Sequence, residues 1–99
     1  IEEVHHKKKI DKPSGTALEI MHLIMEEDTN KNINLSDIVS LREDDVSGIH
    51  KVTFSCNDVS FIFKHNAISR DIFGNGALHC AKKIFELEPN LYTFEKIID

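Results

Sequence analysis

Apolar residues in the first part of the chain recur three or four positions apart over residues 17–25. This is the spacing of one face of an α-helix, so the stretch predicts an amphipathic helix. Ser14 or Thr16 is expected to cap its start, and Glu19 would complete a capping box with Thr16. The helix is expected to end near Asp28, because the polar residues that follow favour a loop.

A second stretch with helical spacing covers residues 71–87. Pro89 should end this helix, because proline cannot continue the hydrogen-bond ladder. Apolar positions in residues 91–98 predict a short closing helix.

Between the two helices, apolar and polar residues alternate. Residues 51–56 and 59–66 follow this pattern on either side of Asn57–Asp58, which predicts a β-hairpin. Residues 1–4 and 38–41 are expected to be further strands. The predicted fold class is therefore α+β, with a mixed, mostly antiparallel sheet and helices on one face. The second hairpin strand is apolar on both faces at its centre, so we expect a second subunit to cover it and the sheet to serve oligomerisation.

Length and composition narrow the possible functions. A chain of 99 residues is one domain at most, and an oligomer would add the burial that a small core lacks. Apolar content of 40% and charged content of 29% are typical of an ordered globular domain. A net charge of −5 argues against non-specific nucleic-acid binding.

Cysteines and apolar runs say little about location. Cys56 and Cys80 lack metal-type spacing, and we expect two buried free thiols. Neither a signal peptide nor a membrane span is evident, so a cytoplasmic location is expected.

The residue types that carry chemistry are concentrated near the start of the chain. His5 and His6 are followed by Lys9 and then by Pro-Ser-Gly-Thr at the expected helix start. Imidazole changes its protonation near neutral pH, and a lysine ammonium can hold an anion or donate a proton. The free amides of a helix start also favour a carboxylate or phosphate. The stretch therefore predicts a site for a small anionic substrate beside a proton donor, although such a loop alone is more often solvated surface.

The same stretch closely resembles the pattern Glu-x-His-His-x-x-Lys-x-Asp-x-Pro-Ser-Gly-Thr-Ala of dihydrodipicolinate reductase (4-hydroxy-tetrahydrodipicolinate reductase), the NAD(P)H-dependent enzyme of bacterial lysine and diaminopimelate synthesis. Residues 48–54 and 65–78 resemble two further segments of that family. The fixed positions of the pattern are met by Glu3, His5, His6, Lys9, Asp11, Pro13, Ser14, Gly15, Thr16 and Ala17.

The resemblance implies that residues 1–99 are the C-terminal substrate-binding and tetramerisation domain of such an enzyme. The N-terminal Rossmann domain and the start of this domain would be absent, so the chain alone is not expected to turn over. The substrate would be a cyclic dicarboxylate and the assembly a homotetramer. NADPH or NADH would be bound mainly by the absent domain.

The resemblance also implies roles for individual residues. His5 would be the proton donor or acceptor and Lys9 the proton donor. His6, Gly15 and Thr16 would hold the carboxylates of the substrate.

Neighbouring residues are expected to support this site. Asp11 should order the loop, either by bonding the amides of residues 14–16 or by pairing with a lysine. His50 and His65 are expected to make structural hydrogen bonds. Arg70 could assist the substrate site or pair with an acid, and the sequence does not choose between these roles.

Two other functions are weighed against the reductase. One is a truncated, non-catalytic oligomerisation or anion-binding module. The other is an unrelated hydrolase or metal protein that uses His5 and His6, which chelation would inactivate. A metal site is not expected, because adjacent side chains rarely face one ion and no further ligand completes the set at typical spacing.

Overall fold

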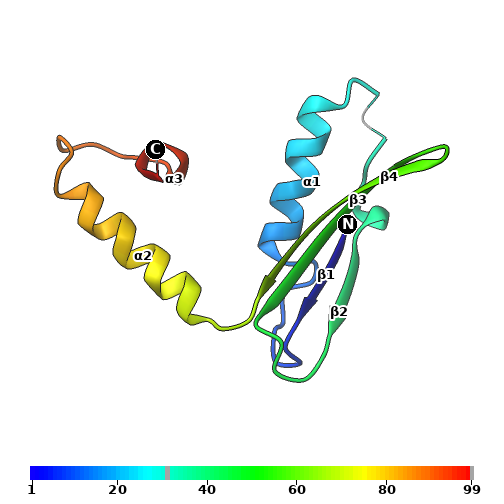
Figure 1. Cartoon of the computed structure of the whole chain (residues 1–99), viewed down its shortest axis with the longest axis horizontal. Coiled ribbons are helices and arrows are strands. Elements are labelled where there is room, and N and C mark those ends of the chain that lie inside the picture. Colours follow the sequence, from blue (N-terminus) through cyan, green and yellow to red (C-terminus); the bar gives the residue numbers. More distant parts are fainter. Residues whose placement is uncertain (31, 99) are drawn as a thin grey trace. The chain divides into compact units, whose positions relative to one another are not determined.

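The computed structural model describes residues 1–30 and 32–98. The chain divides into two compact units, Ile1–Ile68 and Ser69–Asp99. Figure 1 shows a sheet and a long helix in the first unit, and two helices in the second.

The first unit is built on a four-stranded sheet with the order β2-β1-β3-β4. Its strands are β1 (Glu2–His5), β2 (Val39–Arg42), β3 (Gly48–Cys56) and β4 (Val59–Ala67). Strand β1 pairs parallel to β2, and the other pairs are antiparallel. The predicted α+β class with a mixed, mostly antiparallel sheet is therefore confirmed.

Strands β3 and β4 form the predicted hairpin, and their pairing runs from Gly48–Ala67 to Cys56–Val59. Asn57 lies in the turn with a φ of 48°, a left-handed conformation that asparagine tolerates. Strand β3 begins at Gly48, three residues earlier than the alternation indicates, because its first half pairs with β1.

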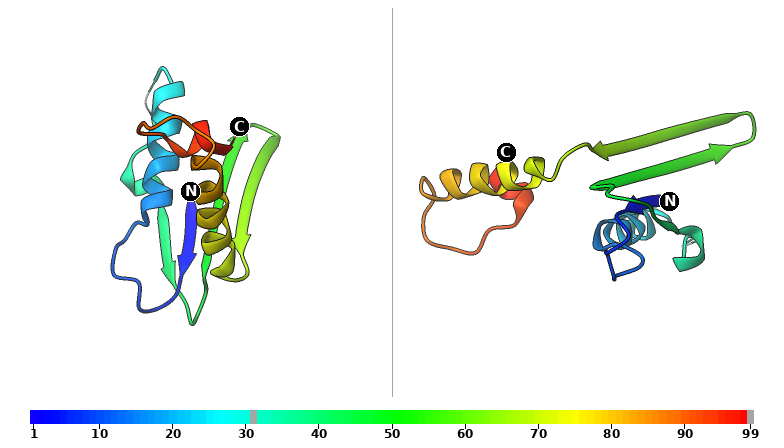
Figure 2. Two further views of the ribbon diagram at one scale, coloured as in Figure 1. Left: turned by 90° about the vertical axis from the view of Figure 1, so that its left-hand side faces the viewer. Right: turned by 90° about the horizontal axis from the view of Figure 1, so that it is seen from below.

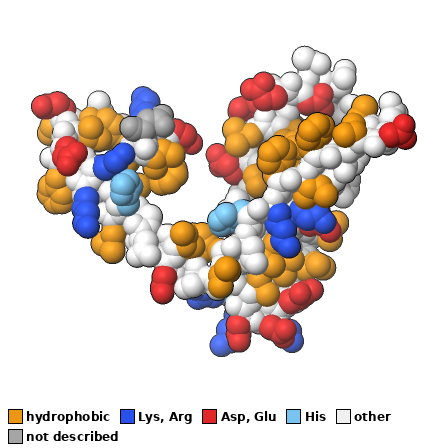
Figure 3. Space-filling view, in the orientation of Figure 1, with side chains coloured by type: hydrophobic (Ala, Val, Ile, Leu, Met, Phe, Trp, Pro, Cys, Tyr) orange, Lys and Arg blue, Asp and Glu red, His pale blue; other side chains and the backbone are white. Residues whose placement is uncertain are grey.

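Large apolar side chains are exposed along this hairpin, and Figure 3 shows apolar atoms gathered in a band over it. They include Phe54, Val59, Phe61, Ile62 and Phe63. The expected cover from a second subunit stays a prediction.

Helix α1 (Gly15–Glu27) lies against one face of the sheet and buries Ala17 and Met21 (Figure 2). Its N-cap is Ser14, whose Oγ accepts a hydrogen bond from the amide of Ala17 at 3.2 Å. The alternative cap at Thr16, with its capping box, is wrong, because Thr16 already lies inside the helix. The predicted end is confirmed, since Asp28 is the C-cap residue.

An apolar groove of 580 Å³ runs between the second half of α1 and the hairpin. Its lining includes Leu23, Ile24, Phe54 and Phe63. Among the described residues that line it, the charged ones are Glu27 and Asp28 at the end of α1. Two acidic groups would repel an anion, so this groove does not suit the anionic ligand that the sequence predicts.

The remaining elements are a short 3-10 helix, η1 (Leu35–Asp37), in the first unit, and α2 (Asp71–Ile84) and α3 (Phe94–Ile98) in the second. The prediction that the second helix reaches residue 87 is wrong. Residues 86 and 87 bond back by three positions, to Lys83 and Ile84, and these tighter turns end the helix before Pro89.

Neither cysteine is buried, contrary to expectation. Cys56 is exposed because it ends β3 beside the hairpin turn. Cys80 is half-buried on α2, in a small unit whose buried apolar residue is Ile97.

Among residues 1–30 and 32–98, none of the helices combines the length and apolar character needed to cross a membrane.

Candidate functional site

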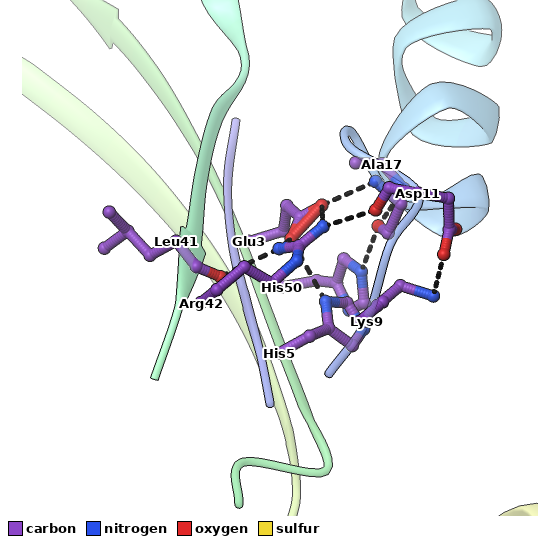
Figure 4. Close-up of polar contacts among 9 residues, drawn as sticks. Glu3, His5, Lys9, Asp11, Ala17, Leu41, Arg42 and His50 are labelled. Atoms are coloured by element: carbon purple, nitrogen blue, oxygen red, sulfur yellow. Dashed lines mark hydrogen bonds and ion pairs between the residues drawn. The ribbon is translucent and has the colours of Figure 1, made fainter. Parts of the chain in front are cut away.

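The carboxylate of Glu3 lies at the centre of a polar cluster beside the start of α1 (Figure 4). The strand alternation of β1 directs Glu3 and His5 to the face that carries α1, and Glu3 pairs there with His50 of β3. Glu3 is completely buried. A buried charge is costly unless it is paired and hydrogen-bonded, so its partners define the site.

Three groups satisfy this carboxylate. The guanidinium of Arg42 pairs with it, the amide of Ser14 donates to Oε2 at 2.5 Å, and His5 Nδ1 lies 3.1 Å from Oε1. Burial alone would raise the pKa of Glu3, but the hydrogen bonds from Arg42, Ser14 and His5 outweigh it and lower the pKa to about 2. Glu3 is therefore ionised at neutral pH.

Ser14 joins the strand to the helix. Its amide is held by Glu3, and its hydroxyl both caps α1 and lies 3.0 Å from Nε2 of His50. Ser14 is 2% exposed, so its hydroxyl is committed to structure. The predicted structural hydrogen bond of His50 is thereby confirmed.

The rings of His5 and His50 meet edge to face, with centroids 5.1 Å apart. Burial lowers the pKa of His50, and the neighbouring His5 lowers it further. Gly48 leaves the space for His5, because a Cβ at position 48 would lie 3.3 Å from His5 Nε2.

Lys9 lies in the loop between β1 and α1 and pairs with Asp11, with Nζ 3.0 Å from Oδ1. The hydrogen bond from Lys9 lowers the pKa of Asp11 more than any other contact. The charge of Lys9 also contributes to lowering the pKa of His50, which places Lys9 within electrostatic range of the histidine pair. Of the two roles expected for Asp11, pairing with a lysine is confirmed.

The first amides of α1 are free to bind a ligand. Neither Gly15 nor Thr16 donates its amide hydrogen to a described residue, whereas Ser14 and Ala17 both do. Both residues are exposed, and no atom comes within 4 Å of the Cβ position at Gly15. Two unpaired donors at a helix start carry partial positive charge and can receive a carboxylate.

The cluster therefore brings together the means to bind and protonate an anion. The amides of Gly15 and Thr16 have no acceptor among the described residues, and Lys9, which pairs with Asp11, adds a cation. His5 provides an imidazole that Glu3 holds from one side. Groups of these types can bind an anion and transfer a proton. Within the described residues, no group of three or more His, Cys, Asp or Glu side chains is arranged to hold a metal ion.

Three further residues singled out from the sequence have a defined position in the structure, but their roles stay predictions. His6 is half-buried, next to His5. His65 lies opposite His50 in the β3–β4 pairing, and its expected structural hydrogen bond stays a prediction. Arg70 precedes α2 in the second unit and makes no side-chain cap there, so its role also stays a prediction.

Two parts of this network were missed from sequence. Arg42 lies just beyond the strand predicted over residues 38–41, yet it ends β2 beside Glu3. Glu3 was noted only as a fixed position of the family pattern. One sequence signal could have identified the pair: an acidic residue at an inward position of a strand needs a cation as its buried partner.

Comparisons with known proteins show which family the chain resembles. A family model described as dihydrodipicolinate reductase, C-terminus, matches residues 1–98. A 4-hydroxy-tetrahydrodipicolinate reductase from Thermosipho africanus is 42% identical over 98 residues, which cover 99% of this chain and 42% of the relative. The reductase of the same name from Methanopyrus kandleri is 33% identical, with 99% and 40% covered. The chain thus spans less than half the length of these relatives.

A solved structure shares the fold. The dipicolinate-bound dihydrodipicolinate reductase from Paenisporosarcina sp. TG-14 superposes with a TM-score of 0.72 at 24% identity. The match covers 97% of this chain and 43% of that protein. At this identity the likeness supports the fold alone.

Proposed function

The chain belongs to the family of dihydrodipicolinate reductase C-terminal domains, and on this premise we propose that it is the substrate-binding and tetramerisation domain of a 4-hydroxy-tetrahydrodipicolinate reductase. Relatives that the chain matches over almost its whole length are named as such reductases. The reaction would reduce a cyclic dicarboxylate to tetrahydrodipicolinate, in lysine and diaminopimelate biosynthesis.

The observation that supports this proposal most is that the amides of Gly15 and Thr16 have no acceptor among the described residues, at the end of the loop that carries Lys9. A cyclic dicarboxylate needs a separate set of donors for each carboxylate. The amides suit one carboxylate, and His6 with the Lys9 ammonium suits the other. The structural neighbour is described as bound to dipicolinate, a molecule of this class.

Reduction of an electron-poor ring adds a hydride to carbon and a proton to a neighbouring atom. We assign the proton to Lys9, with His5 as donor or acceptor in the same step. Glu3 supports His5, because an ionised carboxylate 3.1 Å from Nδ1 fixes the orientation of the ring and favours a proton on that nitrogen.

The hydride would come from NADPH or NADH. The residues of this chain do not fit that cofactor by themselves, since the loop between β1 and α1 contains no glycine and therefore no glycine-rich dinucleotide turn. Cofactor binding is therefore assigned to a Rossmann domain outside this sequence.

The sheet is the proposed tetramer surface. Side chains on both faces of β4 are exposed in the chain, including Phe61, Ile62 and Phe63. Association of copies through this sheet would remove these apolar side chains from water.

A perturbation experiment tests the binding site directly. Unlabelled pyridine-2,6-dicarboxylate is added to the 15N-labelled chain, and amide shifts are followed by NMR. The proposal predicts saturable shifts centred on Gly15, Thr16 and Lys9. Shifts centred on the apolar groove near Phe54, or no shifts, would contradict it.

A further inference from the structure

Arg42 contacts two separate parts of the site with one side chain. Its Nη1 pairs with the carboxylate of Glu3 on the neighbouring strand. Its Nη2 donates to the main-chain oxygen of Asp11 at 2.6 Å and lies 3.4 Å from Glu3 Oε2. Figure 4 shows Arg42 between these two partners. Arg42 is 12% exposed and holds both at once.

The loop that carries Lys9 ends at Ser14, which is held to the sheet by Glu3 and His50. The amide of Lys7 bonds the oxygen of Asp44 at 3.1 Å, and the amide of Lys9 bonds back to His6 within the loop. The side-chain pair between Lys7 and Asp44 is largely exposed, so it adds little. The bond from Arg42 to the oxygen of Asp11 therefore ties the second half of the loop to β2.

We propose that Arg42 is a positioning residue, which fixes the Lys9–Asp11 pair and the start of α1 in the arrangement that receives a dicarboxylate. This inference rests on the proposed function. Arg42 need not touch the substrate, because both of its Nη atoms are directed to protein acceptors. A planar guanidinium can reach Glu3 and Asp11 together, whereas an ammonium presents a single point charge.

Two substitutions separate positioning from charge. Arg42→Lys keeps a cation for Glu3 but cannot bridge to the oxygen of Asp11, and Arg42→Gln removes the charge as well. Lys51→Gln is the matched control, because it breaks the exposed pair between Lys51 and Glu2 on the opposite face of the sheet. Amide NMR spectra establish that each variant keeps the sheet.

Two readouts follow in the complete 99-residue chain. The first is the pKa of the Asp11 carboxyl by 13C NMR, which Lys9 holds below its ordinary value only while the loop is in place. The second is the affinity for pyridine-2,6-dicarboxylate by calorimetry. In Arg42→Lys the pKa of Asp11 is expected to rise to its ordinary value, and the affinity to fall on the order of a hundredfold. Lys51→Gln should change neither.

Other outcomes would overturn the positioning role of Arg42. If Arg42→Lys keeps both the lowered Asp11 pKa and the parental affinity, Arg42 supplies charge alone and the proposal is overturned. If Arg42→Gln fails to fold, Arg42→Lys still decides. If the parental chain does not bind the dicarboxylate, the proposed function fails, and the Asp11 titration then decides by itself whether Arg42 holds the loop.

Discussion

The amide of Ser14 donates a hydrogen bond to the carboxylate of Glu3 at 2.5 Å, across eleven residues of sequence. This bond joins strand β1 to the start of helix α1. His5 follows Glu3 on the strand, and Gly15 and Thr16 follow Ser14 on the helix. One buried carboxylate therefore sets the relative position of the candidate proton-transfer and anion-binding groups.

The chain should depend on Glu3 for its stability. Glu3→Gln leaves the guanidinium of Arg42 without its carboxylate, and breaking a buried pair costs about 3–5 kcal/mol. Urea unfolding at pH 7 measures the loss. Glu2→Gln, which affects only the exposed pair with Lys51, is the control and should change stability little.

Glu3 should also make the chain sensitive to acid. Its folded pKa of about 2 lies below the ordinary value of 4.5, so the folded state gains about 3 kcal/mol of stability above that ordinary value. The gain is lost as pH falls from 4.5 through about 2. Unfolding free energies at a series of pH values should show this loss in the parental chain and not in Glu3→Gln. Equal slopes for both would contradict the assignment.

Ser14 and His50 are predicted to act together. Ser14→Ala removes the N-cap of α1, at a cost of about 1 kcal/mol, and also removes the polar partner of His50.

The pKa of His50 is lowered in the folded chain. The contribution of His50 to stability is therefore full above pH 6.5, its ordinary pKa, and declines as the pH falls below that value. Histidine NMR should therefore show His50 titrating below 6.5. Titration above that value would contradict its burial.

Gly48 is predicted to control the placement of His5. In Gly48→Ala the added Cβ would lie 3.3 Å from His5 Nε2, so the ring must move by a few tenths of an ångström. We expect altered His5 NMR signals and weaker dicarboxylate binding. Gly74→Ala on α2 is the matched control, since nothing lies within 4 Å of that position. Identical His5 signals in Gly48→Ala would show that the contact is not limiting.

The two lysines of the loop should differ in catalysis. In an enzyme chain that joins this sequence to a dinucleotide-binding domain, Lys9→Ala should lower kcat by about a hundredfold or more, as expected for a lost proton donor. Lys7→Ala removes the same charge from an exposed position and should change kcat little. Steady-state kinetics compares them. Equal losses would replace a specific role for Lys9 with a diffuse effect of charge.

Local patterns were sufficient to predict most of the first unit. Alternation identified the hairpin around Asn57, and helical spacing identified α1 down to its end at Asp28. The cap was ambiguous because Ser14 and Thr16 both suit the position. Glu3 favours Ser14 as the cap, because it binds the amide of Ser14 while that residue has the extended conformation of an N-cap.

The polar network could not be predicted in the same way. Arg42 and Glu3 are 39 residues apart, and their contact exists only because β2 and β1 are neighbours in the sheet. The burial of Cys56 and Cys80 was predicted wrongly for a different reason. Cysteine is usually buried, but neither residue lies in a part of this chain that forms a closed interior.

The proposed site binds a dicarboxylate at Lys9 and the start of α1. Calorimetric titration with pyridine-2,6-dicarboxylate tests it most directly, with Lys9→Ala beside Lys7→Ala. Saturable binding is expected for the parental chain and for Lys7→Ala, with loss of binding in Lys9→Ala. Absence of binding by the folded parental chain, or equal binding by all three, would show that the proposed site is wrong.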